Sequence, residues 1–215
     1  LAKSNLLIFY SDLFKNSSDD TNKIQKLSNE LLSSVIKSSH STLGTLEKLV
    51  PETYDLILAN PPYYQSAVIT EASKTIKLEN SETKAYTTGG RGIEALFTEW
   101  IIKSLKKGGE ANIILPDGIF TNIANDKLKK LILDSCYIES IISLPVGTFF
   151  NTPKKTFILT VHKKNDNELN IAQPYPIFTY LCSTIGETMD SYRFDIEGND
   201  LRDAVDLYLS LIHIS

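Results

Sequence analysis

The sequence has little of several residue types that would point to particular functions. Its 215 residues include only two cysteines, one methionine, one tryptophan and three histidines. Cys136 and Cys182 are far apart, with no Cys or His nearby at metal-ligand spacing, so we expect free buried thiols in a reducing compartment. No apolar run is long enough to cross a bilayer, and no signal-peptide pattern occurs. These absences favour a cytoplasmic protein with no metal centre and no membrane partner.

A strong excess of basic charge is also lacking. The chain has 22 Lys and Arg against 26 Asp and Glu, for a net charge of -4, and 42% of its residues are hydrophobic. This composition is typical of a globular protein with a core. A role in binding nucleic acid would therefore need a local basic patch or a basic partner subunit.

Neither end of the sequence has the pattern of a natural terminus. The chain has no initiator methionine and opens in an apolar stretch that predicts a strand over residues 5–10. It closes on the apolar residues 207–215, without a capping signal. We therefore expect a fragment of a longer protein.

Helical and strand patterns alternate along the rest of the chain. Apolar residues at helical spacing predict helices over residues 23–37, 93–105, 124–134 and 200–212. Short apolar runs predict strands over residues 54–59, 111–115, 137–144, 155–162 and near 177–182. Residues 65–90 are polar and aperiodic, which is typical of a mobile loop. We expect Gly108 and Gly109 to end the second helix, with Lys103, Lys106 and Lys107 in its last turns.

This alternation predicts an α/β fold with a parallel sheet. The connection between 137–144 and 155–162 is too short for a crossover helix, so these two strands should pair antiparallel. We expect one domain, a Rossmann-like sheet that ends in an antiparallel hairpin. Within it we distinguish an insertion over residues 1–53, a catalytic core over 54–164 and a C-terminal extension over 165–215.

One stretch carries a specific chemical signal: Asp-Leu-Ile-Leu-Ala-Asn-Pro-Pro-Tyr-Tyr at residues 55–64. Ligand sites in open α/β sheets lie at the carboxyl ends of strands, where Asn60 is predicted. Pro61 and Pro62 fix the backbone and remove N–H donors while keeping their carbonyls. Rigid acceptors beside the Tyr63 ring suit a planar group with an NH2, such as adenine, guanine or glutamine. The plain alternative is a stiff loop with surface tyrosines.

Such acceptors would assist chemistry at an amine. The lone pair of an exocyclic amine is delocalised into its ring, which makes the amine a poor nucleophile. Two carbonyls that accept its N–H protons stabilise the positive charge that develops during attack. The Tyr63 ring can stack on the base, which must be flipped out of a duplex to reach such a pocket.

Several further motifs follow this one in a fixed order. They are Gly-Gly-Arg-Gly-Ile-Glu-Ala-Leu-Phe at 89–97, Leu-Lys-Lys-Gly-Gly at 105–109, Ile-Ile-Leu-Pro-Asp-Gly-Ile-Phe at 113–120, Ile-Ile-Ser-Leu-Pro-Val-Gly-Thr-Phe-Phe at 141–150 and Lys-Lys-Thr-Phe-Ile-Leu at 154–159. With residues 55–63, they resemble the modification subunits of type I restriction–modification systems, which are N6-adenine DNA methyltransferases. The resemblance covers about residues 1–10 and 54–210. It implies S-adenosyl-L-methionine as cofactor, DNA as substrate, a specificity subunit as partner and, in some systems, a restriction subunit.

The resemblance also implies roles for individual residues. Asn60, Pro61, Pro62 and Tyr63 match the catalytic motif of the family. In amino-methyltransferases, an aromatic residue at the place of Phe149 and Phe150 stacks on the other side of the flipped base, although hairpin packing is the plain alternative.

Cofactor contacts are less sharply marked. Asp12 follows the first predicted strand, where the family often has an acid for the cofactor's adenine. Residues 39–46 are an alternative source of that contact, and a solvated helix cap is the plain alternative for Asp12. Phe97 is a second candidate cofactor contact, with a core position as its alternative.

The sequence also departs from the family's pattern. It has no G-x-G fingerprint for the methionine end of the cofactor and no matching acid for the ribose. The glycines at 89–92 follow no strand, so we interpret them as a flexible loop and helix N-terminus. The functional alternative is a loop that closes over the site or touches backbone phosphate. Lys154 and Lys155 either contact phosphate or act as gatekeeper charges that keep the adjacent strand from pairing with another chain. Methylation of a protein glutamine or an RNA base amine stays open, as does a non-catalytic assembly module.

Overall fold

The computed structural model describes residues 49–62, 86–90, 92–149, 153–190 and 192–212, together with positions 26, 29, 30 and 46. The chain divides into two compact units, residues 1–45 and 46–215. In the first unit, Lys26, Asn29 and Glu30 are helical, in agreement with the helix predicted over 23–37. The second unit contains all of the strands described below.

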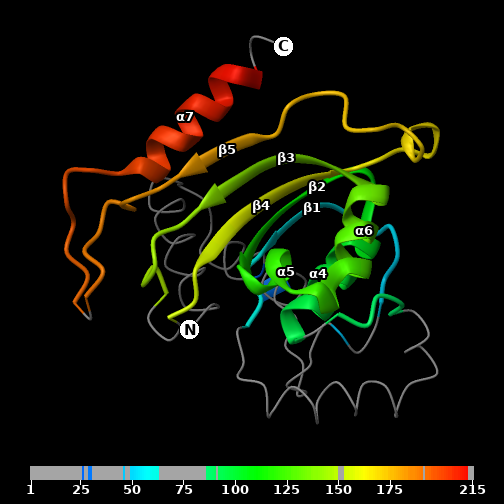
Figure 1. Ribbon diagram of the computed structural model, residues 1–215, viewed down its shortest axis with the longest axis horizontal. Coiled ribbons are helices and arrows are strands. Elements are labelled where there is room, and N and C mark those ends of the chain that lie inside the picture. Colours follow the sequence, from blue (N-terminus) through cyan, green and yellow to red (C-terminus); the bar gives the residue numbers. More distant parts are fainter. Residues whose placement is uncertain are drawn as a thin grey trace. The chain divides into compact units, whose positions relative to one another are not determined.

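The second unit is built on a five-stranded sheet in the order β1-β2-β4-β3-β5 (Figure 1). Its strands are β1 (Tyr54–Ala59), β2 (Leu105–Pro116), β3 (Cys136–Ser143), β4 (Thr156–Lys163) and β5 (Phe178–Leu181). β1 pairs parallel with β2, and β5 pairs parallel with β3. The predicted α/β fold and the five strands predicted between residues 54 and 182 are therefore confirmed, whereas the strand predicted over residues 5–10 lies outside the described residues.

The predicted antiparallel hairpin is confirmed as well. β3 pairs antiparallel with β4, with Ile142 opposite Ile158. β4 also pairs antiparallel with β2, so the second strand of the hairpin lies between β2 and β3. Two successive antiparallel pairings make β3 parallel to β1 and β2, so all three strands end at the same end of the sheet.

Helices lie on both faces of the sheet. Figure 1 shows α4 (Ile93–Ser104), α5 (Gly118–Thr121) and α6 (Asp126–Ser135) together on one face. The Phe120 ring of α5 contacts Phe157 on that face, with ring centroids 5.4 Å apart. Because side chains alternate along a strand, Ile158 points to the opposite face, where it packs with Ile142 and with Ala204 of α7 (Asp200–Ile212). α7 therefore covers the face opposite α5.

The end of α4 differs from the prediction. We expected Gly108 and Gly109 to terminate the helix, but α4 ends at Ser104 and both glycines lie within β2. A Cβ on Gly109 would lie 2.9–3.1 Å from the carbonyl oxygens of Lys106, Asp55 and Tyr54. Gly108 has a positive φ of 72°, and the register between β1 and β2 shifts nearby. The glycine pair thus forms an irregularity in β2 that lets the backbones of β1 and β2 approach closely. Glycine is also common at the ends of helices, which is why the sequence pattern suggested a helix end here.

No helix in the described parts of the chain is both long enough and apolar enough to span a membrane.

Candidate functional site

Asn60 lies where the sequence predicts it, directly after β1 at the carboxyl end of the sheet. β1 pairs with β2 up to Ala59, opposite Ile113, so the chain leaves the sheet at Asn60. Asn60 is exposed, whereas Pro61 is buried and Pro62 is half-buried. The backbone after Asn60 is therefore fixed by packing, whereas Asn60 itself lies at the surface. Tyr63 lies outside the described residues.

The turn that carries Phe149 lies at the same end of the sheet. It connects the end of β3 to the start of β4, and Leu144 N donates to Thr156 O at 3.0 Å across its base. The Thr148 hydroxyl and backbone N–H both donate to the carbonyl of Pro145, at 2.7 and 3.3 Å. Phe149 is half-buried. The structure thus brings Phe149 to the end of the sheet that carries Asn60; Phe150 lies outside the described residues.

A buried acid sits at the start of α4, at this same end. The side chain of Glu94 is 10% exposed and lies 3.5 Å from the Nζ of Lys154, just before β4. Its Oε2 has no hydrogen-bond partner among the described residues. Gly92 beside it has a φ of 96°, and a Cβ there would lie 2.7 Å from that oxygen. Glu94 therefore links the start of α4 to the turn that precedes β4.

Glu99 is an important residue that the sequence analysis missed. It is fully buried in α4 and accepts hydrogen bonds from the backbone N–H groups of Thr87 and Thr88, at 2.6 and 3.2 Å. The Thr88 hydroxyl also donates to it, and Lys103 Nζ lies 2.6 Å away. Burial alone would raise the pKa of Glu99, but the bonds from Lys103, Thr88 and Thr87 outweigh it and hold the pKa below its usual value. The available signal was a Glu four residues before a Lys on one helix.

Glu99 changes the interpretation of the loop before α4. We expected a mobile loop over residues 65–90 and a flexible glycine run at 89–92. In the part that the structure describes, Thr87 and Thr88 are anchored by Glu99, and a Cβ on Gly90 would lie 2.7 Å from the Cβ of Ala95. These residues pack closely on α4, so they correct that expectation.

The remaining predicted residues are less informative. Phe97 is half-buried on α4. Asp12 and residues 39–45 lie outside the described residues. Cys136 and Cys182 are buried free thiols, as predicted, and burial raises the pKa of Cys136 to about 12, so it stays protonated. Across the described residues, no group of three His, Cys, Asp or Glu side chains could hold a metal ion.

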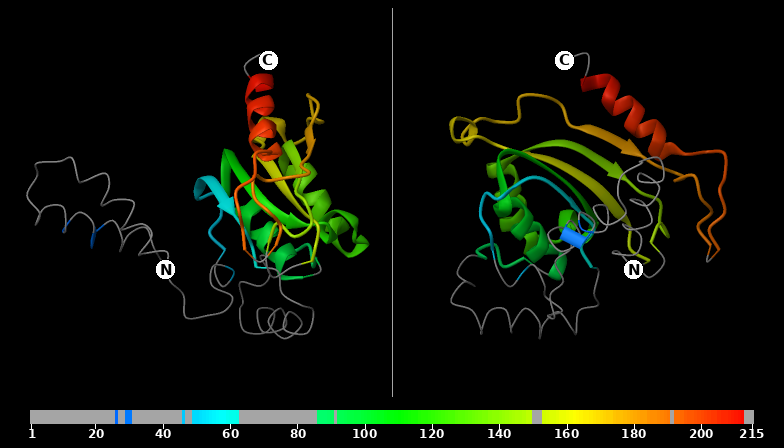
Figure 2. Two further views of the ribbon diagram at one scale, coloured as in Figure 1. Left: turned by 90° about the vertical axis from the view of Figure 1, so that its left-hand side faces the viewer. Right: turned by 180° about the vertical axis from the view of Figure 1, so that it is seen from behind.

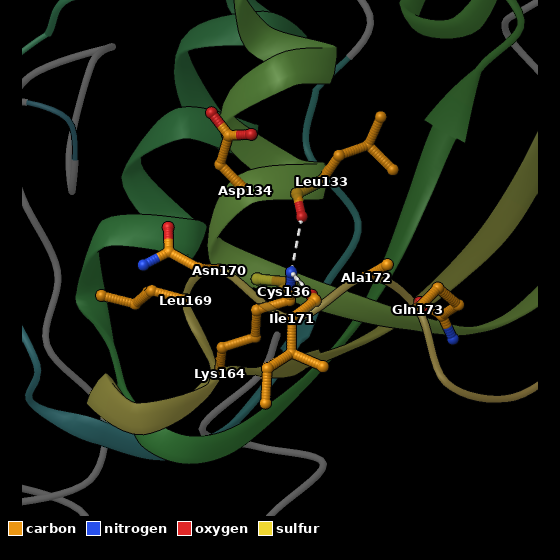
Figure 3. Close-up of a pocket in the computed structure, with 9 residues that line it drawn as sticks. All are labelled: Leu133, Asp134, Cys136, Lys164, Leu169, Asn170, Ile171, Ala172 and Gln173. Atoms are coloured by element: carbon orange, nitrogen blue, oxygen red, sulfur yellow. Dashed lines mark hydrogen bonds between the residues drawn. The ribbon is translucent and has the colours of Figure 1, made fainter.

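A cavity of about 410 Å³ opens at the amino end of the sheet, beside the first residue of β3 (Figure 3). Lys164 lies in its wall and is only 4% exposed. Its Nζ donates to the carbonyls of Leu133 and Ile171, each at 3.0 Å, and sits 4.9 Å from the centroid of the Tyr137 ring. Figure 3 shows both hydrogen bonds as dashed lines between residues that line the cavity. The ammonium is thus engaged within the protein, and we regard this cavity as structural.

Comparison with known proteins identifies the family. A family model described as N-6 DNA Methylase matches residues 8–211. The Type II methyltransferase M.HincII of Haemophilus influenzae is 28% identical over 146 residues, which cover 66% of this chain and 29% of that protein. The Type I restriction enzyme EcoKI methylase subunit of Escherichia coli is 27% identical over 120 residues, or 55% of this chain and 20% of that protein. The chain therefore spans less than a third of the length of either relative.

Solved structures agree on the fold. The methyltransferase subunit of a type I restriction–modification system from Streptococcus thermophilus matches with a TM-score of 0.53 and 22% identity, over 74% of this chain and 32% of that chain. This likeness supports the Rossmann-like arrangement of the sheet. Because the family model covers nearly the whole sequence, the chain belongs to the N-6 DNA methylase family.

Proposed function

We propose that this chain is the part of a DNA methyltransferase that binds the amine receiving the methyl group. The enzyme transfers that methyl group from S-adenosyl-L-methionine to N6 of a flipped adenine in DNA. The observation that carries the proposal is the position of Asn60. It is an exposed amide at the carboxyl end of a parallel strand, followed by a buried proline, in a chain of the N-6 DNA methylase family.

The backbone around Asn60 suits recognition of an NH2 group. The Asn60 side-chain carbonyl and the Pro61 carbonyl are acceptors, and Pro61 has no N–H that would compete. Because Pro61 is buried, its carbonyl is held by packing before any substrate arrives. Acceptors that are already in place stabilise the charge that develops on the amine without reorganising.

The turn between β3 and β4 supplies the second element. We propose that Phe149 or Phe150 stacks on one face of the flipped adenine, and that Tyr63 stacks on the other. Stacking on aromatic rings is favourable for every base and compensates in part for the unstacking that flipping requires. Selection of adenine then falls to the acceptors at Asn60 and Pro61.

The described residues fit the cofactor only in part. The carboxyl end of the sheet offers acceptors and aromatic side chains, which suit the amine that receives the methyl group. No G-x-G run of the sequence follows a predicted strand, as a turn for the cofactor's methionine end would, and Asp12 and Phe97 stay our candidates for contacts to its adenine. When bound, S-adenosyl-L-methionine supplies an electrophilic methyl group; the residues of this chain orient and polarise the amine that attacks it.

Partners follow from the relatives. Those relatives include methylase subunits of type I restriction enzymes. We propose that a specificity subunit selects the DNA sequence, that a restriction subunit joins in some assemblies, and that the enzyme acts in the cytoplasm. The net charge of -4 fits this division, because a basic partner would then provide much of the phosphate contact. The family match favours adenine in DNA over a protein glutamine or an RNA base.

The decisive experiment removes the Asn60 amide from the full-length protein that carries this chain, purified with any specificity subunit. Transfer of a labelled methyl group to unmethylated phage DNA is measured for the parent protein and for Asn60→Ala. We expect a loss of about 100-fold or more, by analogy with the removal of one preorganised hydrogen-bonding group in other enzymes. Binding of S-adenosyl-L-methionine, measured by calorimetry, should persist.

Asn170→Ala is the matched control, because Asn170 is an exposed asparagine in the wall of the cavity at the amino end of the sheet. It should leave the rate unchanged. Methylation of DNA by Asn60→Ala at the parent rate would contradict the role of Asn60. If the parent protein labels RNA or protein instead of DNA, the proposed substrate is wrong. If it binds no cofactor, the assembly-module alternative gains support.

A further inference from the structure

A short arm in the C-terminal region has no place in the site described so far. It consists of residues 186–190 and 192–196, drawn in orange in Figure 2. Glu187 and Asp195 form an antiparallel bridge, and Thr188 N donates to Phe194 O at 2.9 Å. Ile196 N closes the base of the arm by donating to Gly186 O at 2.9 Å. These bonds define a small two-stranded element outside the main sheet.

Arg193 connects this arm to the turn between β3 and β4. Its Nη2 donates to the carbonyls of Gly147 and Thr148, at 2.7 and 3.0 Å, across more than forty residues of sequence. Its Nη1 donates to the carbonyl of Thr188, at 3.1 Å, within the arm. One guanidinium therefore bridges two segments, and its planar fork suits this better than the single ammonium of a lysine.

The arm also lies in direct contact with the turn. Gly147 has a φ of 88°, and a Cβ on it would lie 3.7 Å from the Cβ of Met189. Met189 Sδ in turn lies 3.3 Å from Arg193 Nη1. The half-buried guanidinium thus lies where the arm packs against the turn. A charge-assisted hydrogen bond is stronger in such a place than it would be in water.

The position of the two carbonyls explains why this contact matters. The carbonyl of Thr148 belongs to the same planar peptide unit as the N and Cα of Phe149. A donor that holds this carbonyl therefore fixes the plane from which the Phe149 side chain departs. The neighbouring carbonyl of Gly147 fixes the preceding plane, so the chain enters Phe149 in one direction.

We propose that Arg193 is a positioning residue for methyl transfer: it holds the turn so that the Phe149 ring is presented to the flipped adenine. The inference rests on the proposed function, because it assumes that Phe149 stacks on the base. It assigns to a residue far along the chain a task that the Asn-Pro-Pro-Tyr motif cannot perform. The arm would then support the turn that carries Phe149.

A double-mutant cycle tests the proposal on the full-length protein with phage DNA and labelled S-adenosyl-L-methionine. Arg193→Ala should lower kcat/KM by about 10- to 100-fold, because a small misplacement of a positioning group is costly. Arg193→Lys should recover part of this loss. In a Phe149→Ala background, adding Arg193→Ala should cost less than threefold more, since the two residues would act as one unit.

Arg202→Ala is the matched control, because it removes the same charge from the exposed surface of α7. It should leave kcat/KM within twofold of the parent value, and calorimetry should show unchanged cofactor binding for all variants. The proposal is overturned if Arg193→Ala keeps the parent rate, if Phe149→Ala does, or if Arg193→Ala costs the same factor in both backgrounds. Where Arg193→Ala fails to fold, the same cycle with Arg193→Lys decides.

This result can be separated from the proposed function as a whole. If Asn60→Ala abolishes transfer while the Arg193 cycle is additive, only the positioning role fails. If Asn60→Ala is fully active, the proposed function fails first.

Discussion

The two ends of the sheet use their polar groups in opposite ways. At the amino end, the lysines are engaged within the chain. Lys163 and Lys164 donate to backbone carbonyls, and Lys106 Nζ lies 2.8 Å from Asp55 at the start of β1. These contacts tie the starts of the strands and the helix ends together, so this end of the sheet serves stability.

The carboxyl end carries an exposed amide and a buried carboxylate. Asn60 is exposed, and Glu94 Oε2 has no hydrogen-bond partner among the described residues. The turn after β3 is held by hydrogen bonds of its own and, in addition, by Arg193 from outside the sheet. The exposed Asn60 and the turn that carries Phe149 both lie at the carboxyl end, which is why we propose it as the catalytic end of the sheet.

The largest effect on stability should come from Lys164→Met at the amino end. The substitution leaves the carbonyls of Leu133 and Ile171 without their charged donor inside a buried wall, so we expect a loss of about 3 kcal/mol in the free energy of unfolding. Urea denaturation measures this loss. Methyl transfer per folded molecule should be unchanged, and Lys127→Met on the exposed side of α6 should alter neither quantity. A fall in specific activity comparable to that of Asn60→Ala would break the comparison between the two ends.

A smaller and pH-dependent effect should follow from Glu99→Gln. The pKa of Glu99 is held below its usual value in the folded protein, so its carboxylate stabilises the fold above the pKa of the unfolded chain. This contribution is lost as the pH falls through the lowered pKa of the folded protein. At pH 7, we expect Glu99→Gln to be less stable than the parent by about 1–2 kcal/mol.

The measurement is a series of urea midpoints between pH 7 and pH 3 for both proteins. The gap between them should narrow as the solution becomes more acidic. A gap that stays constant over this range would show that the charge of Glu99 contributes nothing and that only its shape matters.

The smallest effect should come from Asp55→Asn. The side-chain hydrogen bond from Lys106 lowers the pKa of Asp55, yet both side chains are well exposed, at 82% and 45%. Exposed ion pairs are screened by solvent and salt, so we expect no measurable change in the thermal midpoint at 0.5 M salt. A clear drop in that midpoint would show that the start of β1 is more tightly coupled to β2 than its exposure indicates.

The sequence predicted those elements whose signals are local. The apolar run before Asn60 and the helical spacing after Gly92 are complete within a dozen residues, and both β1 and α4 begin where they were expected. The antiparallel pairing of β3 and β4 followed from the length of their connection alone. The placement of Asn60 at a strand end needed nothing beyond these patterns.

The features that sequence reasoning missed depend on distant partners. Gly108 and Gly109 carry the same local signal as a helix cap, and only the approach of the Tyr54 and Asp55 carbonyls decides that they belong to a strand. Glu99 is distinguished by a loop that folds back onto it. Arg193 stands out only when the chain has brought a turn 45 residues earlier within reach of its guanidinium.

The order of the strands bears on how the molecule comes into being. β2 and β3 are synthesised before β4, yet β4 lies between them and pairs with both. β2 and β3 must therefore stay apart in the nascent chain until β4 is available. If they paired directly in parallel, this misfolded pairing would have to break before β4 could insert between them. The turn with Phe149 takes its final form only when this last central strand is inserted. Because the turn that carries Phe149 connects β3 to β4, it can close only after residue 163, the end of β4, has left the ribosome.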